Sequence, residues 1–110
     1  MINPSKLNQF DRYIHKDGLI IWYEKGTDEI VGTLSLNMDQ GQMWISSLYV
    51  SPLYRGKGIC RSMLDYAVFN GGNYLRVRKG NPALWIYKKY GFKIFDETNE
   101  YYYMRLNVGD

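Results

Sequence analysis

The chain has 110 residues, of which 45% are hydrophobic and 16% aromatic, and its net charge at pH 7 is +3. This length and composition favour one folded globular domain over residues 1–110 and argue against a disordered chain. The sequence has no run of about 18 apolar residues and no basic-then-apolar N-terminus, so it predicts neither a membrane span nor a secretory signal, and no membrane partner. Its single cysteine cannot form an internal disulfide, and together these features predict a cytoplasmic protein.

The charges are unevenly distributed along the chain. Residues 55–93 contain nine basic side chains and one acidic side chain, whereas the remainder contains five basic and ten acidic ones. A basic segment fits a polyanionic ligand, and an acidic remainder fits a cationic acceptor such as an amine. The alternatives are an ordinary solvated surface and a nucleic-acid partner, which is less favoured because no nucleic-acid motif accompanies the charge.

The first segment has the pattern of a helix. Asn3-Pro4 is typical of a helix start, and apolar residues then recur at helical spacing before a glycine, namely Leu7, Phe10, Ile14 and Gly18. The pattern predicts one helix over residues 4–16. His15, the only histidine, lies near the negative end of this helix, which favours a surface role over catalysis.

Three stretches rich in β-forming residues follow, at residues 19–24, 29–38 and 42–50, with glycine-containing turns between them. The short connections predict an antiparallel meander. In the second strand, one face should belong to the core and the other should be partly wet. The predicted core face holds Ile30, Gly32, Leu34, Leu36 and Met38, and the other face holds Val31, Thr33, Ser35 and Asn37.

The strand that ends at Val50 leads through Ser51-Pro52 into a basic turn with two glycines and then into an amphipathic helix at about residues 58–70. The first turn of a helix has free N–H groups and a positive dipole end, so this arrangement predicts an anion-binding site. Gly56 and Gly58 allow positive φ and a close backbone approach, and further charge comes from Arg55, Lys57 and Arg61. The alternative is a tight strand-to-helix connection without a ligand.

The rest of the chain alternates between strands and one more helix. Residues 74–78 form a predicted strand, which implies a right-handed crossover and parallel pairing with residues 42–50. Asn81-Pro82 starts a second helix that ends at Gly91-Phe92, and two strands follow at residues 93–97 and 100–106.

Two motifs give the chain a family resemblance. Arg55-Gly-Lys-Gly-Ile-Cys60 resembles the Arg/Gln-x-x-Gly-x-Gly/Ala signature of the GNAT acyltransferase superfamily, in which this turn binds the pyrophosphate of acetyl-coenzyme A. Cys60 departs from the signature, because the family usually has glycine or alanine at that position. The second motif is Tyr87-x-x-x-Gly91-Phe92, which resembles the family's closing motif Asn-x-x-Ala-x-x-x-Tyr-x-x-x-Gly-Phe.

Within the second motif, Ala83 and Tyr87 are in register, but Asn81 stands six residues before the tyrosine instead of seven. Asn81 is therefore better explained as a helix cap than as a cofactor contact, although the contact stays open. The resemblance implies that the phenol of Tyr87 protonates the departing thiolate, since a neutral phenol is a proton donor at pH 7. The alternative is a half-buried tyrosine with a purely structural role.

The resemblance implies an α/β fold with a mixed sheet, in which an antiparallel meander is followed by a β-α-β crossover, as in GNAT acyl-CoA N-acyltransferases. It implies that acetyl-CoA is the co-substrate, that it lies where two neighbouring strands separate, and that the acceptor is a primary amine on a protein lysine, a protein N-terminus or a small molecule. The alternative is a catalytically silent module that binds acetyl-CoA and regulates a partner. The cofactor-binding residues that the resemblance implies are Leu48, Tyr49, Val50, Arg55, Gly56, Lys57, Gly58, Ile59, Cys60, Arg61 and Asn81.

Several roles stay unassigned. Many family members carry a carboxylate base on the strand before the turn, but residues 42–50 contain none, and the base is left open between Glu24, Asp39 and a water chain through Ser46 or Ser47. Cys60 is expected to pack beside the phosphates, with acyl transfer through its thiol as a remote alternative. One histidine and one cysteine do not make a zinc site, so no metal is predicted.

The acceptor site is expected to be unusually open. Relatives usually place two helices over it, but the segment before the meander has room for only one. An open site suits a protein acceptor or a flexible polyamine, or it can be completed by a partner or a second subunit, so a homodimer is a further expectation. Residues 101–103 are expected to pack as a strand, and the alternative is that one of these tyrosines lines the acceptor pocket with Trp22 or Trp44.

Overall fold

The computed structural model describes residues 4–106, so Asn3 of the predicted helix start lies outside the described residues. The described elements are η1 (Pro4–Gln9), β1 (Asp11–Ile14), β2 (Leu19–Tyr23), β3 (Ile30–Asp39), β4 (Gln42–Val50), η2 (Pro52–Tyr54), α1 (Ile59–Phe69), β5 (Tyr74–Arg78), α2 (Ala83–Tyr90), β6 (Phe92–Glu97) and β7 (Tyr101–Leu106). No helix within this part of the chain is long and apolar enough to cross a membrane.

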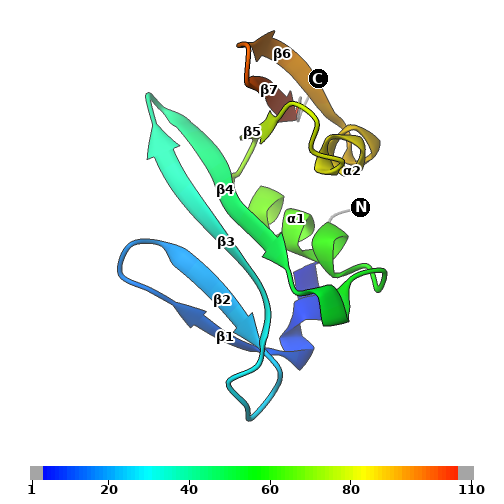
Figure 1. Ribbon diagram of the computed structural model, residues 1–110. Coiled ribbons are helices and arrows are strands. Elements are labelled where there is room, and N and C mark those ends of the chain that lie inside the picture. Colours follow the sequence, from blue (N-terminus) through cyan, green and yellow to red (C-terminus); the bar gives the residue numbers. More distant parts are fainter. Residues whose placement is uncertain (1–3, 107–110) are drawn as a thin grey trace.

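The strands form a seven-stranded mixed sheet in the order β1-β2-β3-β4-β5-β7-β6. Pairing is antiparallel from β1 to β4, parallel between β4 and β5, and antiparallel again among β5, β7 and β6. The predicted α/β class, the meander and the crossover through α1 are therefore confirmed. Figure 1 shows that β1–β4 and β5–β7 form two groups that diverge from the point where β4 meets β5.

The predicted helix over residues 4–16 is wrong. The chain forms a short 3-10 helix up to Gln9 and then β1, which pairs along its whole length with β2, including Tyr13 with Ile21 and Ile14 with Ile20. Three apolar residues at helical spacing are a weak signal, and the hydrogen bonds to a neighbouring strand outweigh it because Tyr13 and Ile14 are good β-formers. Gly18 closes the β1–β2 turn, where its N–H donates to the carbonyl of His15.

The predicted division of β3 into a core face and a wet face is correct only in its middle. Gly32 and Leu34 are buried, but Ile30 and Met38 are 40% and 63% exposed, and Val31 is fully buried. The β2–β3 register shifts next to Trp22, where the ladder skips Val31. This irregularity breaks the alternation on which the prediction depended.

Helix α1 packs against β3 and β4 at a position without a side chain. A Cβ on Gly32 would lie 2.6 Å from the carbonyl oxygen of Tyr49 and 2.9 Å from the Sδ of Met63, a buried α1 residue. The core extends from there over Leu64, Ala67, Leu75 and Met104. Helix α2 is joined to α1 by a 2.7 Å hydrogen bond that the Tyr90 hydroxyl donates to the carboxylate of Asp65, which is itself buried.

The parallel pairing of β4 with β5 is short. It comprises only Trp44 with Tyr74 and Ile45 with Leu75. Just beyond these pairs β4 contains a bulge, because Ser47 and Leu48 together face Leu34 of β3, and Ser47 has a φ of +53°. Thr33 donates its hydroxyl proton to the carbonyl of Ser47 at 2.9 Å and holds the bulge in place. The sheet therefore opens between β4 and β5 directly after Ile45.

Candidate active site

A groove of about 500 Å³ lies between the end of β4, the first turn of α1 and the start of α2. We call it the helix-side groove. It is defined by Leu48, Tyr49, Val50, Tyr54, Arg55, Gly56, Gly58, Ile59, Cys60, Asn81, Pro82, Ala83, Ile86 and Tyr87. The structure thus brings together ten of the twelve site residues that the sequence singles out. The other two, Lys57 and Arg61, belong to the turn and the first turn of α1 beside it.

The turn before α1 offers free backbone donors. Gly56 and Gly58 have φ values of +75° and +78°, in the region that favours glycine, and Gly58 precedes the first residue of α1. The first hydrogen bond of α1 runs from the Ser62 N–H to the Gly58 carbonyl at 3.1 Å. Within residues 4–106, no acceptor is bonded to the N–H groups of residues 56–61. These donors lie at the positive end of the helix dipole, which is the arrangement that suits an anion.

Arg55 folds back along β4 instead of extending over the turn. Its Nε donates to the Val50 carbonyl at 2.9 Å, and its guanidinium lies 6.0 Å from the centre of the Tyr49 ring. The Val50 carbonyl is therefore already engaged within the protein. Lys57 and Arg61 lie over the rings of Tyr54 and Tyr90 at 5.6 and 5.5 Å.

Two further residues act at this turn, and no sequence pattern indicates them. Lys6 donates through Nζ to the Lys57 carbonyl at 3.5 Å and lies 3.0 Å from the position of a Cβ on Gly58. It adds a positive charge from a segment far away in the sequence, and no local pattern signals this approach. The hydroxyl of Tyr54 donates to Glu24 at 2.6 Å and lies 3.3 Å from Glu29, and these carboxylates raise the pKa of Tyr54. Tyr54 thereby ties the turn to the β2–β3 connection.

Tyr87 lines the groove. It is 9% exposed, its ring packs edge-on against Phe92 at 6.3 Å, and none of the hydrogen bonds among the described residues involves its hydroxyl. Burial, with a smaller contribution from Cys60, raises the pKa of Tyr87 to about 12. The phenol therefore keeps its proton throughout the neutral range and is free to donate it into the groove.

Cys60 is half-buried on the groove wall, and burial raises the pKa of its thiol. A raised pKa keeps the thiol protonated at neutral pH, which disfavours a nucleophilic role because the thiolate is the reactive form. This environment supports the expected packing role.

Asn81 caps α2, as the sequence predicts. Its Oδ1 accepts a hydrogen bond from the Ala83 N–H at 2.9 Å. The residue also lines the groove, together with Tyr87.

Two smaller cavities lie near the groove. The strand gap, about 200 Å³, lies in the opening between β4 and β5 and shares Leu48, Asn81 and Tyr87 with the groove. The outer-face cavity, about 330 Å³, lies beyond it and is lined by Asn37, Asp39, Trp44, Ile45, Ser46, Arg76 and Tyr103. Ser46 and Ser47, two of the candidates for a water relay, line the gap, and Asp39 lies in the outer-face cavity. Glu24, the remaining candidate base, accepts the hydrogen bond from Tyr54 and lines none of these three cavities.

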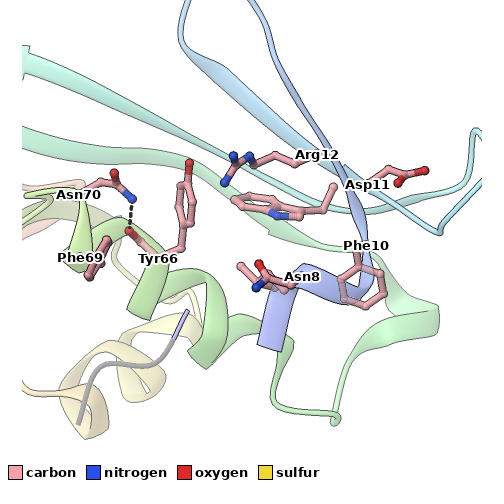
Figure 2. A pocket seen from close by; sticks show the side chains of 9 residues that line it. Asn8, Phe10, Asp11, Arg12, Tyr66, Phe69 and Asn70 are labelled. Atoms are coloured by element: carbon pink, nitrogen blue, oxygen red, sulfur yellow. Dashed lines mark hydrogen bonds between the residues drawn. The ribbon is translucent and has the colours of Figure 1, made fainter. Parts of the chain in front are cut away.

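The largest cavity, about 860 Å³, lies elsewhere, between η1, β1, β2 and α1. Figure 2 shows Arg12 beside Tyr66 at this N-terminal cavity, and the guanidinium lies 5.5 Å from the ring centre. Trp22, named above as a possible acceptor-pocket residue, is 2% exposed here and packs edge-on against Tyr66, away from residues 101–103. None of the twelve predicted site residues lines this cavity.

Comparisons with known proteins give one consistent family. The model of the acetyltransferase (GNAT) domain matches residues 16–94. One similar crystal structure is the PaiA N-acetyltransferase from Thermoplasma acidophilum in complex with coenzyme A, which is 22% identical with a TM-score of 0.68 over 82% of this chain and 60% of that chain. Another is an acyl-CoA N-acyltransferase from Pseudomonas aeruginosa, which is 19% identical with a TM-score of 0.66 over 81% of this chain and 67% of that chain. PH1933 from Pyrococcus horikoshii OT3 is 27% identical, with a TM-score of 0.64 over 84% of this chain and 67% of that chain.

These likenesses show the GNAT acyl-CoA N-acyltransferase fold for the described sheet and helices. The chain spans less than two thirds of the length of the Thermoplasma acidophilum structure. No curated protein matches the chain significantly.

Replacing Asn81 by alanine removes the side-chain cap of α2. We expect the free energy of unfolding to fall by about 1 kcal/mol, the usual cost of losing such a cap, in urea denaturation monitored by circular dichroism. Asn81→Asp is the matched control, because aspartate also accepts a bond from the Ala83 N–H, and it should restore most of the loss. An Asn81→Ala variant of unchanged stability would contradict the capping role.

Proposed function

The chain belongs to the acetyltransferase (GNAT) family, and from this premise we propose that it transfers the acetyl group of acetyl-CoA to a primary amine. One observation supports this most strongly: the helix-side groove is lined both by the turn before α1, where the backbone amides of residues 56–61 are free, and by Tyr87, whose phenol is protonated. A molecule that joins a diphosphate to a thioester matches these two features.

The diphosphate end would be held at the turn before α1. The amides of residues 56–61 supply directed donors, and Lys6, Lys57 and Arg61 supply positive charge around them. Arg55 contributes mainly by fixing the strand end, because its Nε is bonded to Val50. The pantetheine arm would run along Leu48 and Tyr49, next to the bulge where β4 is no longer paired with β5.

Acetyl-CoA supplies the activated acyl group and a thiolate leaving group. In the transfer, the C–S bond breaks while the bond from the amine nitrogen to the acetyl carbon forms, the thiolate takes the proton of Tyr87, and the amine proton passes to water, from which the Tyr87 phenolate regains a proton. Tyr87 suits this task because burial keeps its phenol protonated and because the described part of the chain does not occupy it with another hydrogen bond.

A carboxylate base is absent from β4, where Gln42–Val50 contains none. Ser46 and Ser47 in the strand gap provide hydroxyl groups along which a water can carry the amine proton outward.

We also propose that the protein is cytoplasmic, that residues 1–110 form one transferase domain and that a second copy of the chain is a partner.

A catalytically silent module that binds acetyl-CoA is the second candidate. It is favoured by the missing carboxylate on β4 and by the capping bond of Asn81, which ties that side chain to α2. The buried phenol of Tyr87 on the groove wall opposes it, since a module that only binds has no need of a proton donor there.

The two candidates are separated by combining a binding measurement with a turnover measurement. Acetyl-CoA should raise the melting temperature by several degrees at about 100 times its dissociation constant, because it binds only the folded state, whereas a short DNA duplex should not. Thiol release from acetyl-CoA should then depend on an added amine. Stabilisation without amine-dependent thiol release would favour the silent module, and no stabilisation would contradict both.

Tyr87→Phe keeps the ring against Phe92 and removes only the phenolic proton. We expect kcat to fall about tenfold or more while the dissociation constant of acetyl-CoA changes little, because the proton matters only when the thiolate departs. With the pKa of Tyr87 raised to about 12, the wild-type rate should not decline through ionisation of this phenol at any pH below about 10.

Tyr90→Phe is the matched control. It lies one turn later on α2 and donates its hydroxyl to Asp65 instead of facing the groove, so it should lower stability and leave kcat nearly unchanged. Full turnover in Tyr87→Phe with intact acetyl-CoA binding would remove the acid role.

A further inference from the structure

Three cavities that share lining residues lie at the opening between β4 and β5, and together they outline a route through the sheet. The helix-side groove and the strand gap share Leu48, Asn81 and Tyr87, and the strand gap and the outer-face cavity share Ile45, Ser46 and Arg76. If the thioester lies at Tyr87, as the proposed function requires, an amine reaches it from the outer-face cavity without displacing the cofactor. The residues at the junction of these two cavities therefore select the acceptor.

Arg76 stands at that junction because of the strand register. Leu75 forms the last pair with β4, and Arg76 is the next residue, on the face opposite to Leu75 and on the same face as Tyr74. It pairs with Tyr103 of β7 in the neighbouring ladder, and its guanidinium lies 4.2 Å from the ring centre of Tyr101. Tyr101 thus holds the guanidinium beside the opening between the strands.

Arg76 also differs from its neighbours in its charge partners. Arg78 is 3.2 Å from Glu100, and Lys79 is paired with Glu97. In the stretch from residue 4 to residue 106, Arg76 makes no ion pair with a carboxylate. Asp39, the acid of the outer-face cavity, lies near the β3–β4 turn, beyond the Asn37–Trp44 pair and away from the opening.

The junction therefore favours an anion over a second cation. A guanidinium held flat on an aromatic ring presents a donor edge that matches a carboxylate or a phosphate. Positive charge beside the incoming amine also lowers the pKa of that amine and favours its neutral, nucleophilic form, which fits a site without a carboxylate base on β4.

The size of the route fits a small molecule. The strand gap and the outer-face cavity measure about 200 and 330 Å³, and Trp44 and Tyr103 form an aromatic wall in the latter. Pockets of a few hundred Å³ typically enclose small ligands. A flexible polyamine would bring a second ammonium to Arg76, and the side chain of a protein lysine carries no anion near its amine.

We propose that the acceptor is a small amine that carries an oxyanion, either a carboxylate or a phosphate, and that Arg76 binds this oxyanion while the amine faces Tyr87. The inference rests on the proposed acetyl transfer and narrows its acceptor from primary amines in general to anionic ones. It makes Arg76 a specificity-determining residue.

The test compares amines that differ only in the anion. Thiol release from acetyl-CoA is measured with phenylalanine and phenylalaninamide, with O-phosphoethanolamine and ethanolamine, and with putrescine. For each pair, kcat/KM of the anionic amine is divided by kcat/KM of its neutral counterpart. This ratio is then compared between the wild type and Arg76→Gln, so that intrinsic differences in amine reactivity cancel. We expect Arg76→Gln to lower the ratio about tenfold or more in one pair, because the anionic member loses its oxyanion contact whereas the neutral member loses only the effect of the charge on its amine.

Arg105→Gln is the matched control. Arg105 lies on β7 with its guanidinium 5.3 Å from the ring centre of Phe95, but it lines neither the strand gap nor the outer-face cavity. It removes one positive charge from the protein without altering the junction, so the ratios should stay at wild-type values.

The pattern of results identifies the anion or overturns the inference. An Arg76-dependent ratio in the phenylalanine pair assigns a carboxylate, and one in the phosphoethanolamine pair assigns a phosphate. Equal ratios in the wild type and Arg76→Gln, or putrescine as the best acceptor, would overturn the inference while leaving acetyl transfer intact. No thiol release with any of the five amines, despite acetyl-CoA binding, would contradict the proposed transferase activity and with it the inference.

Discussion

The short parallel pairing between β4 and β5 is the constraint on which the site depends. Two residue pairs join these strands, and directly after Ile45 the bulge at Ser47 and Leu48 keeps β4 from rejoining β5. A longer ladder would have sealed the sheet and separated its two faces. Because the ladder stops, the strand gap shares Tyr87 with the helix-side groove and Arg76 with the outer-face cavity.

The helices fix the positions of the two ends of the groove. Gly58 lets the chain enter α1 with free amides exposed, and the close approach at Gly32 seats α1 on the sheet. The bond from Tyr90 to buried Asp65 is one of the contacts between α2 and α1. The turn before α1 and Tyr87 are therefore carried on two linked helices.

Sequence patterns predicted most of the elements and the grouping of the site residues, because local signals specify them. The glycines at positions 56 and 58 and the Asn81-Pro82 helix start act within a few residues of themselves. The failures involve pairing and contacts with other segments, which the pattern within one segment does not contain. Residues 11–14 pair with β2 instead of extending a helix, a register shift buries Val31, and Lys6 reaches the turn before α1 from the far end of the chain. No local periodicity encodes such contacts.

The central claim is that the main-chain amides of residues 56–61 bind a diphosphate. Titration of the ¹⁵N-labelled protein with coenzyme A, followed by amide NMR shifts, tests it most directly. The account predicts large downfield shifts and slowed hydrogen exchange for these six amides, with little change in the last turn of α1. Binding of coenzyme A that leaves the six amides unperturbed, or no binding at all, would contradict it.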